Sequence, residues 1–219
     1  MNIYAVVEGE VGEKKVYQHW IPLVNAELCY VDHISLIRGN NFSIISGSGY
    51  PNYFNVIEAA IEDVNHYGNI DRLVISIDSE DLSYEEKQIE VTDYLSQLVC
   101  HAEIKVIIQH FCLETWGLEN KIVIRPNPRL PRLIEFKRFF DVRNNDPELL
   151  PNYEPKQLNR SKFAEVYLRS ALNDKYRNLT YTKSNPEALL HHKYFERVKD
   201  RHNNTEHIAS FSSFLSAFI

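Results

Sequence analysis

Residues 73–81, Leu-Val-Ile-Ser-Ile-Asp-Ser-Glu-Asp, decide the fold, because five residues typical of a buried strand run directly into a cluster of acids. In an open α/β sheet, ligands bind beyond the carboxyl ends of the strands. We therefore expect Asp78, Glu80 and Asp81 to lie at that edge of a sheet. Carboxylates held so close together repel one another unless a cation lies among them.

A helix start is a second interpretation of the same acids. Ser83 and Glu86 have the spacing of a capping box, and Asp81 can also cap the helix that follows. Capping explains Asp81 better than it explains Asp78, which stands at the end of the predicted strand. Both interpretations therefore stay open for this stretch.

Strands and amphipathic helices alternate along the first 120 residues. Short apolar runs rich in β-branched and aromatic side chains predict strands at residues 3–7, 32–37, 42–45, 72–77 and 103–109. Apolar residues at helical spacing predict helices that begin near residues 13, 52 and 83, and a short helix at 111–118. This alternation predicts an α/β fold with a mainly parallel sheet flanked by helices.

The sequence changes character after residue 120. Residues 121–157 are basic and proline-bearing, so we expect them to form a connector that ends in a loop at 144–155. Residues 158–219 predict a helical C-terminal part packed on the same domain, with helices at 161–173, at 185–202 and from 205. The last helix has an apolar stripe that we expect in the core, namely Ile208, Phe211, Leu215 and Phe218.

Composition limits the classes of protein to which the chain can belong. Its 219 residues, of which 44% are hydrophobic, suit either one α/β domain of ordinary size with an appendage or two small domains. No run approaches the roughly 20 apolar residues that cross a bilayer, and the N-terminus lacks the basic region of a signal peptide. We therefore expect a cytoplasmic protein without a membrane partner, with its three cysteines as reduced thiols in the core. A net charge of −6 argues against a broadly basic duplex-binding protein, so any contact with nucleic acid must use a local basic patch.

Acids follow two of the predicted strands. Glu8 follows the first, and Asp78, Glu80 and Asp81 follow the fourth. Because parallel strands end at one edge of a sheet, these acids can meet there although they are far apart in the chain. Carboxylate oxygens suit Mg²⁺ or Mn²⁺ rather than zinc. A divalent ion on such carboxylates is typical of phosphoryl chemistry, because it polarises the phosphate and activates a nucleophile.

These motifs resemble the TOPRIM family, and in particular its OLD-like and RloB-like members. Glu8-Gly9 after one strand and Asp78-x-Glu80 after another resemble the Glu and Asp-x-Asp motifs of the TOPRIM fold. The stretch Val7–Tyr17 resembles the opening of the OLD-like and RloB-like proteins, and residues 114–118, Glu-Thr-Trp-Gly-Leu, resemble their Glu-x-Trp-x-Leu motif. The resemblance covers roughly residues 3–120 and implies a TOPRIM/Rossmann-like sheet.

The resemblance and the acidic cluster together assign roles to these residues. The implied catalytic residues are Glu8, Asp78, Glu80 and Glu114. The implied ligands of Mg²⁺ or Mn²⁺ are Glu8, Asp78, Glu80 and Asp81. In the family, the first Glu acts as general base or acid, the Asp-x-Asp pair holds the metal, and the later Glu joins the acidic site.

Three departures from the family pattern bear on these roles. Glu80 stands where the family has Asp, which lengthens one ligand arm. Gly117 stands where a large apolar residue is common. The turn at Glu8-Gly9 has an extra residue before Glu13, so Glu13 is carried over only as a further candidate. Trp116 is expected to pack in the core beside the site.

The resemblance implies a metal-dependent nuclease that cuts DNA or RNA, with tRNA as one candidate substrate, in an anti-phage defence system of the abortive-infection type. An ATPase partner of the ABC/SMC-like type would be a separate polypeptide, because the chain lacks a Gly-x-x-x-x-Gly-Lys phosphate loop. A homodimer is a further option. The basic residues expected to bind the nucleic acid backbone are Arg125, Arg129, Arg132, Lys137 and Arg138. The alternative for that stretch is a solvated helix that packs Phe136, Phe139 and Phe140 inward.

Two other functions stay open on the sequence alone. The first is a catalytically inactive TOPRIM-like subunit that serves as an interaction or regulatory module; the acidic net charge and the imperfect Asp78-x-Glu80 pair motivate it. The second is a small-phosphate hydrolase on a Rossmann-like sheet. The acid pattern favours the nuclease over this hydrolase, because a nucleophilic Asp-x-Asp pair would be expected on the first strand, where Glu8 stands instead.

Overall fold

The computed structural model describes residues 1–49, 51–176, 179 and 181–219. The chain forms two compact units. Unit 1 consists of Met1–Ile77, Tyr84–Ile108 and Ser213–Ile219, and unit 2 consists of Asp78–Ser83 and Gln109–Ser212. Residues 121–157, expected as a connector, lie within unit 2.

Within the described residues, unit 1 is built on a five-stranded sheet with the strand order β2-β3-β1-β4-β5. The strands are Ile3–Val7 (β1), Cys29–Tyr30 (β2), Asn41–Ser46 (β3), Arg72–Asp78 (β4) and Glu103–Gln109 (β5). β1 pairs in parallel with β3 and with β4, and β2 pairs in parallel with β3. The β-branched content and full burial of β1 suit a strand that is covered on both faces. The predicted α/β class is confirmed.

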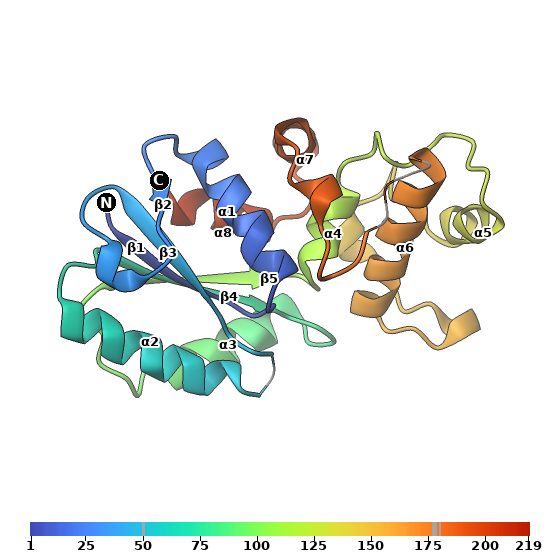
Figure 1. Cartoon of the computed structure of the whole chain (residues 1–219). Coiled ribbons are helices and arrows are strands. Elements are labelled where there is room, and N and C mark those ends of the chain that lie inside the picture. Colours follow the sequence, from blue (N-terminus) through green and yellow to red (C-terminus); the bar gives the residue numbers. More distant parts are fainter. Residues whose placement is uncertain (50, 177–178, 180) are drawn as a thin grey trace. The chain divides into compact units, whose positions relative to one another are not determined.

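Helices cover both faces of this sheet (Figure 1). α1 (Gly12–Val24) and α8 (Phe211–Ala217) lie on one face, and α2 (Tyr53–Tyr67) and α3 (Tyr84–Leu95) lie on the other. Tyr17 of α1 packs edge-on against Phe214 with ring centroids 5.1 Å apart, and its hydroxyl hydrogen-bonds Ser76 of β4 at 2.6 Å. The first face is therefore an aromatic core with one buried polar link to the sheet.

One predicted strand of unit 1 is wrong. Residues 32–37 contain a 3₁₀ turn, Ile34–Leu36, and the edge strand is β2 at Cys29–Tyr30 instead. His33 begins the turn, because its ring nitrogen accepts the N–H of Ser35. Ile34 and Ile37 are both buried, and their spacing of three residues places them on one side of the turn.

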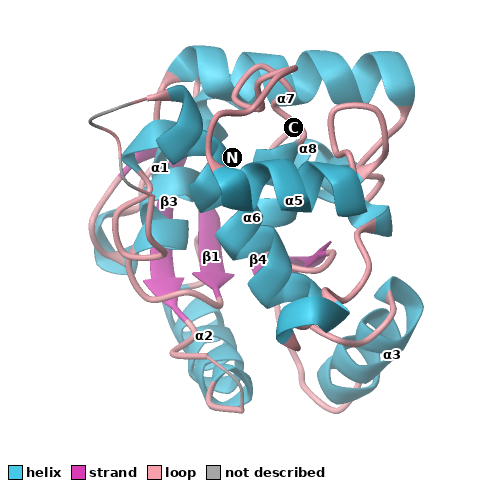
Figure 2. Ribbon diagram, turned by 90° about the vertical axis from the view of Figure 1, so that its right-hand side faces the viewer, coloured by secondary structure: helices cyan, strands magenta, loops and turns pink. Residues whose placement is uncertain are grey.

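Unit 2 consists mainly of helices and loops (Figure 2). Its helices are α4 (Leu113–Leu118), α5 (Pro131–Phe139), α6 (Arg160–Lys175) and α7 (His192–Thr205), with 3₁₀ turns at Pro147–Leu149, Glu154–Lys156 and Glu187–Leu189. α6 is buried on most of its surface and packs against α4 and α5. A Cβ on Gly117 would meet Leu168 Cδ2 at 2.8 Å. The glycine that departs from the family pattern therefore allows α4 and α6 to pack closely.

Two predicted helix starts of the C-terminal part are wrong. The predicted helix at 185–202 is a 3₁₀ turn followed by α7, which begins at His192 and is capped by the side chain of His191. The last helix begins at Phe211 rather than at Thr205, because Glu206 and Ile208 have φ angles of 60° and 48°. A positive φ at these residues is incompatible with a continuous right-handed helix. Phe211 and Phe218 of the predicted stripe are fully buried, whereas Leu215 is half-buried and Phe214 is buried in its place.

The three cysteines are free thiols, but they occupy different environments. Cys112 is buried, Cys100 is half-buried and Cys29 is exposed, so the expectation of core thiols holds fully for Cys112 alone. Among the described residues, none of the helices combines the length and the apolar character that crossing a bilayer requires.

Candidate functional site

The turn that carries Glu8 is held by backbone hydrogen bonds in unit 1. The N–H of Glu8 donates to Ser76 O of β4 at 3.1 Å, and its carbonyl accepts the N–H of Gly49 at 3.2 Å. Gly47 donates to Val7 O at 2.6 Å. A Cβ on Gly47 would lie 3.4 Å from Glu8 Cα and 3.3 Å from Val7 O. The half-buried Glu8 is therefore positioned by the strands on either side of it.

Glu13 fixes the same turn from the first turn of α1. Its Oε2 accepts the backbone N–H of Gly9 at 2.6 Å, and the residue is only 8% exposed. A Cβ on Gly9 would lie 2.8 Å from that oxygen, so a larger residue at this position would displace the side chain of Glu13. The extra residue before Glu13 is thus compatible with a close contact between this carboxylate and the Glu8-Gly9 turn.

Asp78 and Glu80 begin unit 2 on a tight turn. Asp78 is the last residue of β4 and is 9% exposed, whereas Glu80 is exposed and has a φ angle of 52°. The N–H of Ser79 donates to Gln109 O at 2.9 Å, and that of Glu80 donates to Phe111 O at 3.0 Å. The turn therefore presents one buried and one solvent-facing acid.

Glu114 lies in the first turn of α4, every residue of which is buried. It is 2% exposed, and its Oε1 accepts a hydrogen bond of 2.8 Å from the hydroxyl of Tyr181. Burial, together with the charge of Glu114, raises the pKa of Tyr181 well above its ordinary value. Tyr181 therefore remains a neutral donor that compensates the buried carboxylate.

Lys183 was not predicted from the sequence, but its charge interacts with several of the predicted acids. The residue as a whole is exposed, but its ammonium group is surrounded by other groups. Burial alone would lower the pKa of Lys183, yet nearby negative charges raise it well above its ordinary value. The largest of these effects come from Glu114 and Asp78, and Glu80 adds a smaller one.

Three predicted acids, Asp78, Glu80 and Glu114, therefore belong to unit 2, and the charge of each favours the protonated form of Lys183. Lys183 stands in a short turn in which Thr182 and Asn185 pair across an isolated bridge. A lysine between threonine and serine is ordinary in a surface turn, so no spacing or periodicity in the sequence indicates its position. Burial also raises the pKa of the Cys112 thiol, and Glu114 and Asp78 add to this effect.

Asp81 has a structural contact within unit 2. Its Oδ2 accepts a hydrogen bond of 3.2 Å from the side-chain amide of Asn159, which caps the start of α6. This contact accounts for Asp81 without a metal. A role for Asp81 as a metal ligand, and for Glu8 together with the acids of unit 2, stays a prediction.

Trp116 belongs to the core of unit 2. It is fully buried, its Nε1 donates to Ser210 Oγ at 2.7 Å, and its ring packs edge-on against Phe211. The hydroxyl of Ser210 donates in turn to Glu148. Burial raises the pKa of Glu148 from its ordinary value near 4.5 to about 7.

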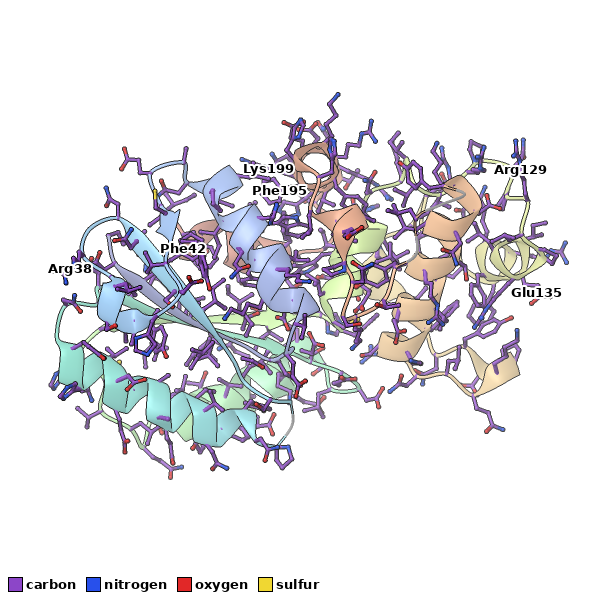
Figure 3. The ribbon with its side chains drawn as sticks, viewed as in Figure 1. Arg38, Phe42, Arg129, Glu135, Phe195 and Lys199 are labelled. Carbon is purple, nitrogen blue, oxygen red and sulfur yellow. The ribbon has the colours of Figure 1, made fainter. Side chains whose placement is uncertain are left out.

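The predicted nucleic-acid-binding residues fall into two groups. Arg125 forms an ion pair of 3.3 Å with Asp174, and Lys137 donates to Pro126 O at 2.5 Å. Arg129, Arg132 and Arg138 are exposed, and their side chains form neither an ion pair nor a hydrogen bond with any described residue. Figure 3 shows Arg129 and Glu135 on the outside of this part of unit 2.

The aromatic residues of the same stretch also differ from one another in their burial. Phe136 is fully buried and packs edge-on against Phe163 and Tyr167, whereas Phe139 is 41% exposed. The guanidinium of Arg132 lies 5.3 Å from the centre of the Phe136 ring. Phe136 therefore packs inward, as the alternative of an amphipathic helix expects, whereas Phe139 is buried only in part.

The donor chemistry of unit 2 suits a hard divalent ion, because Asp78, Glu80 and Glu114 offer carboxylate oxygens. In the part of the chain that the structure describes, no three His, Cys, Asp or Glu side chains are grouped closely enough to hold a metal ion as they stand. Positive charge near these acids comes from Lys183.

No protein-family model, curated protein or solved structure matches the chain.

Proposed function

We propose that this chain is a TOPRIM-type nuclease that hydrolyses phosphodiester bonds in DNA or RNA, including tRNA as one candidate, with Mg²⁺ or Mn²⁺. One observation supports the proposal: Asp78, Glu80 and Glu114, from two distant stretches of chain, lie in unit 2, and each contributes to the raised pKa of Lys183. Carboxylates gathered around a positive charge are the arrangement that metal-assisted phosphoryl chemistry uses.

Each residue has a role in this proposal. The ion, when bound, would polarise the phosphate and lower the pKa of a water molecule. Asp78 and Glu80 would hold it, and Glu114 would orient the site or supply a further ligand. Glu8 would be a ligand or the general base. The ammonium of Lys183 would pair with a phosphate oxygen and stabilise the charge that develops on it.

The exposed arginines would bind the substrate backbone. Arg129, Arg132 and Arg138 have no acidic partner among the described residues, so their charge is available to phosphates. Arg125 and Lys137 are engaged within unit 2, so their contribution would be to hold this surface in place. Binding through the three arginines would weaken as salt concentration rises.

The proposed setting is a cytoplasmic anti-phage system of the abortive-infection type. The family resemblance supports this setting, and with it a separate ATPase of the ABC/SMC-like type. A homodimer is compatible with the same proposal. A pull-down with the product of a neighbouring ATPase gene would test the partner.

The deciding experiment is a cleavage assay with Mg²⁺ or Mn²⁺ on single-stranded DNA, duplex DNA, RNA and tRNA. Glu8→Gln and Asp78→Asn should each reduce cleavage by at least about a hundredfold, because each removes a negative oxygen that the reaction needs. Glu62→Gln and Asp93→Asn change exposed carboxylates on α2 and α3 and serve as matched controls. Undiminished cleavage by both site variants would contradict the proposal. Cleavage of a generic phosphomonoester but of no polynucleotide would favour the small-phosphate hydrolase.

A second function is favoured by Lys183 itself. If its ammonium permanently replaces the metal among the acids, the chain is an inactive TOPRIM-like interaction or regulatory subunit. Calorimetric titration with Mn²⁺ separates the two proposals. The nuclease proposal expects binding that is lost in Asp78→Asn, whereas the inactive subunit expects none in the wild type and a gain in Lys183→Met.

A further inference from the structure

The turn from Asp78 to Leu82 is fastened to the start of α6 by two neighbouring residues. Asn159 Nδ2 donates to Asp81 Oδ2 at 3.2 Å. Arg160 Nη2 donates to two consecutive carbonyl oxygens of the turn, Asp81 O at 3.1 Å and Leu82 O at 3.2 Å. These contacts join parts of unit 2 that are 78 or 79 residues apart in sequence.

Arg160 also contacts the other side of the turn. Its guanidinium lies 4.2 Å from the centre of the Phe111 ring, which is the distance of a cation–π contact. Phe111 is fully buried, and its carbonyl accepts the N–H of Glu80 at 3.0 Å. One planar side chain therefore contacts both the turn and the residue to which Glu80 is hydrogen-bonded. A lysine could not reproduce this geometry, because its ammonium is a point charge without a planar face.

Asn159 performs two tasks at once. Its Oδ1 accepts the N–H of Lys162 at 3.0 Å and so caps α6, while its Nδ2 donates to Asp81. The two tasks use different atoms of the amide and can be separated by substitution. Serine or aspartate at this position keeps a cap acceptor but removes the amide donor, and aspartate also places a second carboxylate against Asp81.

We infer that Asn159 and Arg160 are positioning residues, which hold the acidic turn so that Asp78 and Glu80 keep a fixed orientation. The catalytic consequence of this inference rests on the proposed nuclease function. The turn needs such support because Glu80 adopts a left-handed conformation that is unfavourable for a non-glycine residue. A displacement of about 1 Å at reacting groups is enough to reduce a rate by about a hundredfold.

The test compares Asn159→Ser, Asn159→Asp, Arg160→Lys and Arg160→Gln in the full chain. Amide hydrogen exchange of Glu80 and Leu82 should become about tenfold faster in Asn159→Ser, and faster again in Asn159→Asp and Arg160→Gln. The melting temperature of the two Asn159 variants should change by no more than about 3 °C, because the cap of α6 is kept. Arg160→Lys should restore part of the protection that Arg160→Gln loses.

Cleavage kinetics give the second measurement. The kcat of Asn159→Asp and Arg160→Gln should fall at least about tenfold, with KM changed by less than about twofold, because substrate binding does not involve the turn contacts. Arg169→Gln is the matched control: it removes an arginine of α6 whose ion-pair partner among the described residues is Glu165 on the same helix, and it should change neither exchange nor kcat.

The outcomes separate this inference from the proposed function. Unchanged exchange of the turn in Asn159→Asp and Arg160→Gln would overturn the inference, and so would faster exchange with an unchanged kcat. A wild type that cleaves no polynucleotide would refute the nuclease, and the exchange measurement would then decide alone whether Asn159 and Arg160 hold the turn.

Discussion

The two turns that carry the predicted acids both follow buried strands, but different contacts hold them. In unit 1, the Glu8-Gly9 turn is fixed by backbone hydrogen bonds to neighbouring strands and by Glu13, four residues beyond Gly9. In unit 2, the turn with Asp78 and Glu80 also has backbone hydrogen bonds, to Gln109 and Phe111, and the side chains that contact it come from about 80 residues away in sequence. The side-chain support of the first turn is therefore local in sequence, whereas that of the second comes from tertiary packing.

This difference predicts which side-chain substitutions should disturb each turn. A local turn supported by backbone hydrogen bonds tolerates changes of distant side chains, because its partners remain when they are removed. A turn or a buried acid can instead accept hydrogen bonds from distant side chains. When one of these donors is removed, the group that accepted its hydrogen bond loses that stabilisation. Three substitutions or conditions test the contrast.

The largest effect is expected from Tyr181→Phe. This change removes the hydroxyl that donates to the buried Glu114 across 67 residues of sequence, and it leaves a carboxylate with fewer donors. The expected loss of unfolding free energy is about 2 kcal/mol, measured by urea denaturation near pH 7. Tyr176→Phe, at a tyrosine that is 38% exposed, is the control and should change stability little. Equal effects of the two substitutions would mean that Tyr181 does not support Glu114.

A smaller effect is expected from pH, through Glu148. Its pKa is raised from near 4.5 to about 7 in the folded chain, so the folded state holds a proton that the unfolded state has already released. The stability from this proton is complete below about pH 4.5 and is lost as pH rises through 7. Wild type should therefore lose up to about 1 kcal/mol more than Glu148→Gln between pH 6 and pH 8.

The comparison with Glu148→Gln is needed because other groups titrate in the same network. Burial lowers the pKa of His207, so this residue contributes in the opposite direction: its stability is lost as pH falls below about 6.5. Burial also raises the pKa of Glu119 to about 8, and the charge of Glu148 adds to this effect, so Glu119 contributes in the same direction as Glu148. Denaturation curves of both proteins at several pH values therefore measure Glu148 together with its effect on Glu119, since the glutamine keeps an acceptor for Ser210. Parallel pH profiles would show that Glu148 does not titrate in this range.

The smallest effect is expected in the local turn, from Gly9→Ala. The new methyl group would meet Glu13 Oε2 at 2.8 Å, and the side chain of Glu13 can move at some cost. Gly39→Ala is the matched control, because nothing lies within 4 Å of its added Cβ. We expect Gly9→Ala to be less stable than Gly39→Ala by about 0.5–1 kcal/mol in thermal denaturation. Equal stabilities would show that Gly9 is not required by its contact with Glu13.

The sequence predicted those parts of the fold that depend on local periodicity. The apolar runs at β1, β3, β4 and β5 and the helical spacing of α1, α2, α3 and α6 all correspond to elements of the structure. The errors occur where single residues override that periodicity. His33 starts a turn in place of a strand, and the positive φ angles of Glu206 and Ile208 delay the last helix.

The same distinction between local sequence and tertiary structure applies to the candidate site. The sequence alone determined that acids follow two buried strands, because strand ends and clustered carboxylates are visible in the order of residues. Only the tertiary structure showed that Asp78, Glu80 and Glu114 each act on the pKa of Lys183, and that Asn159 and Arg160 contact the acidic turn. The physical reason is that backbone conformation follows from neighbouring residues, whereas the pairing of charges and donors depends on which distant side chains the packing of the chain brings together.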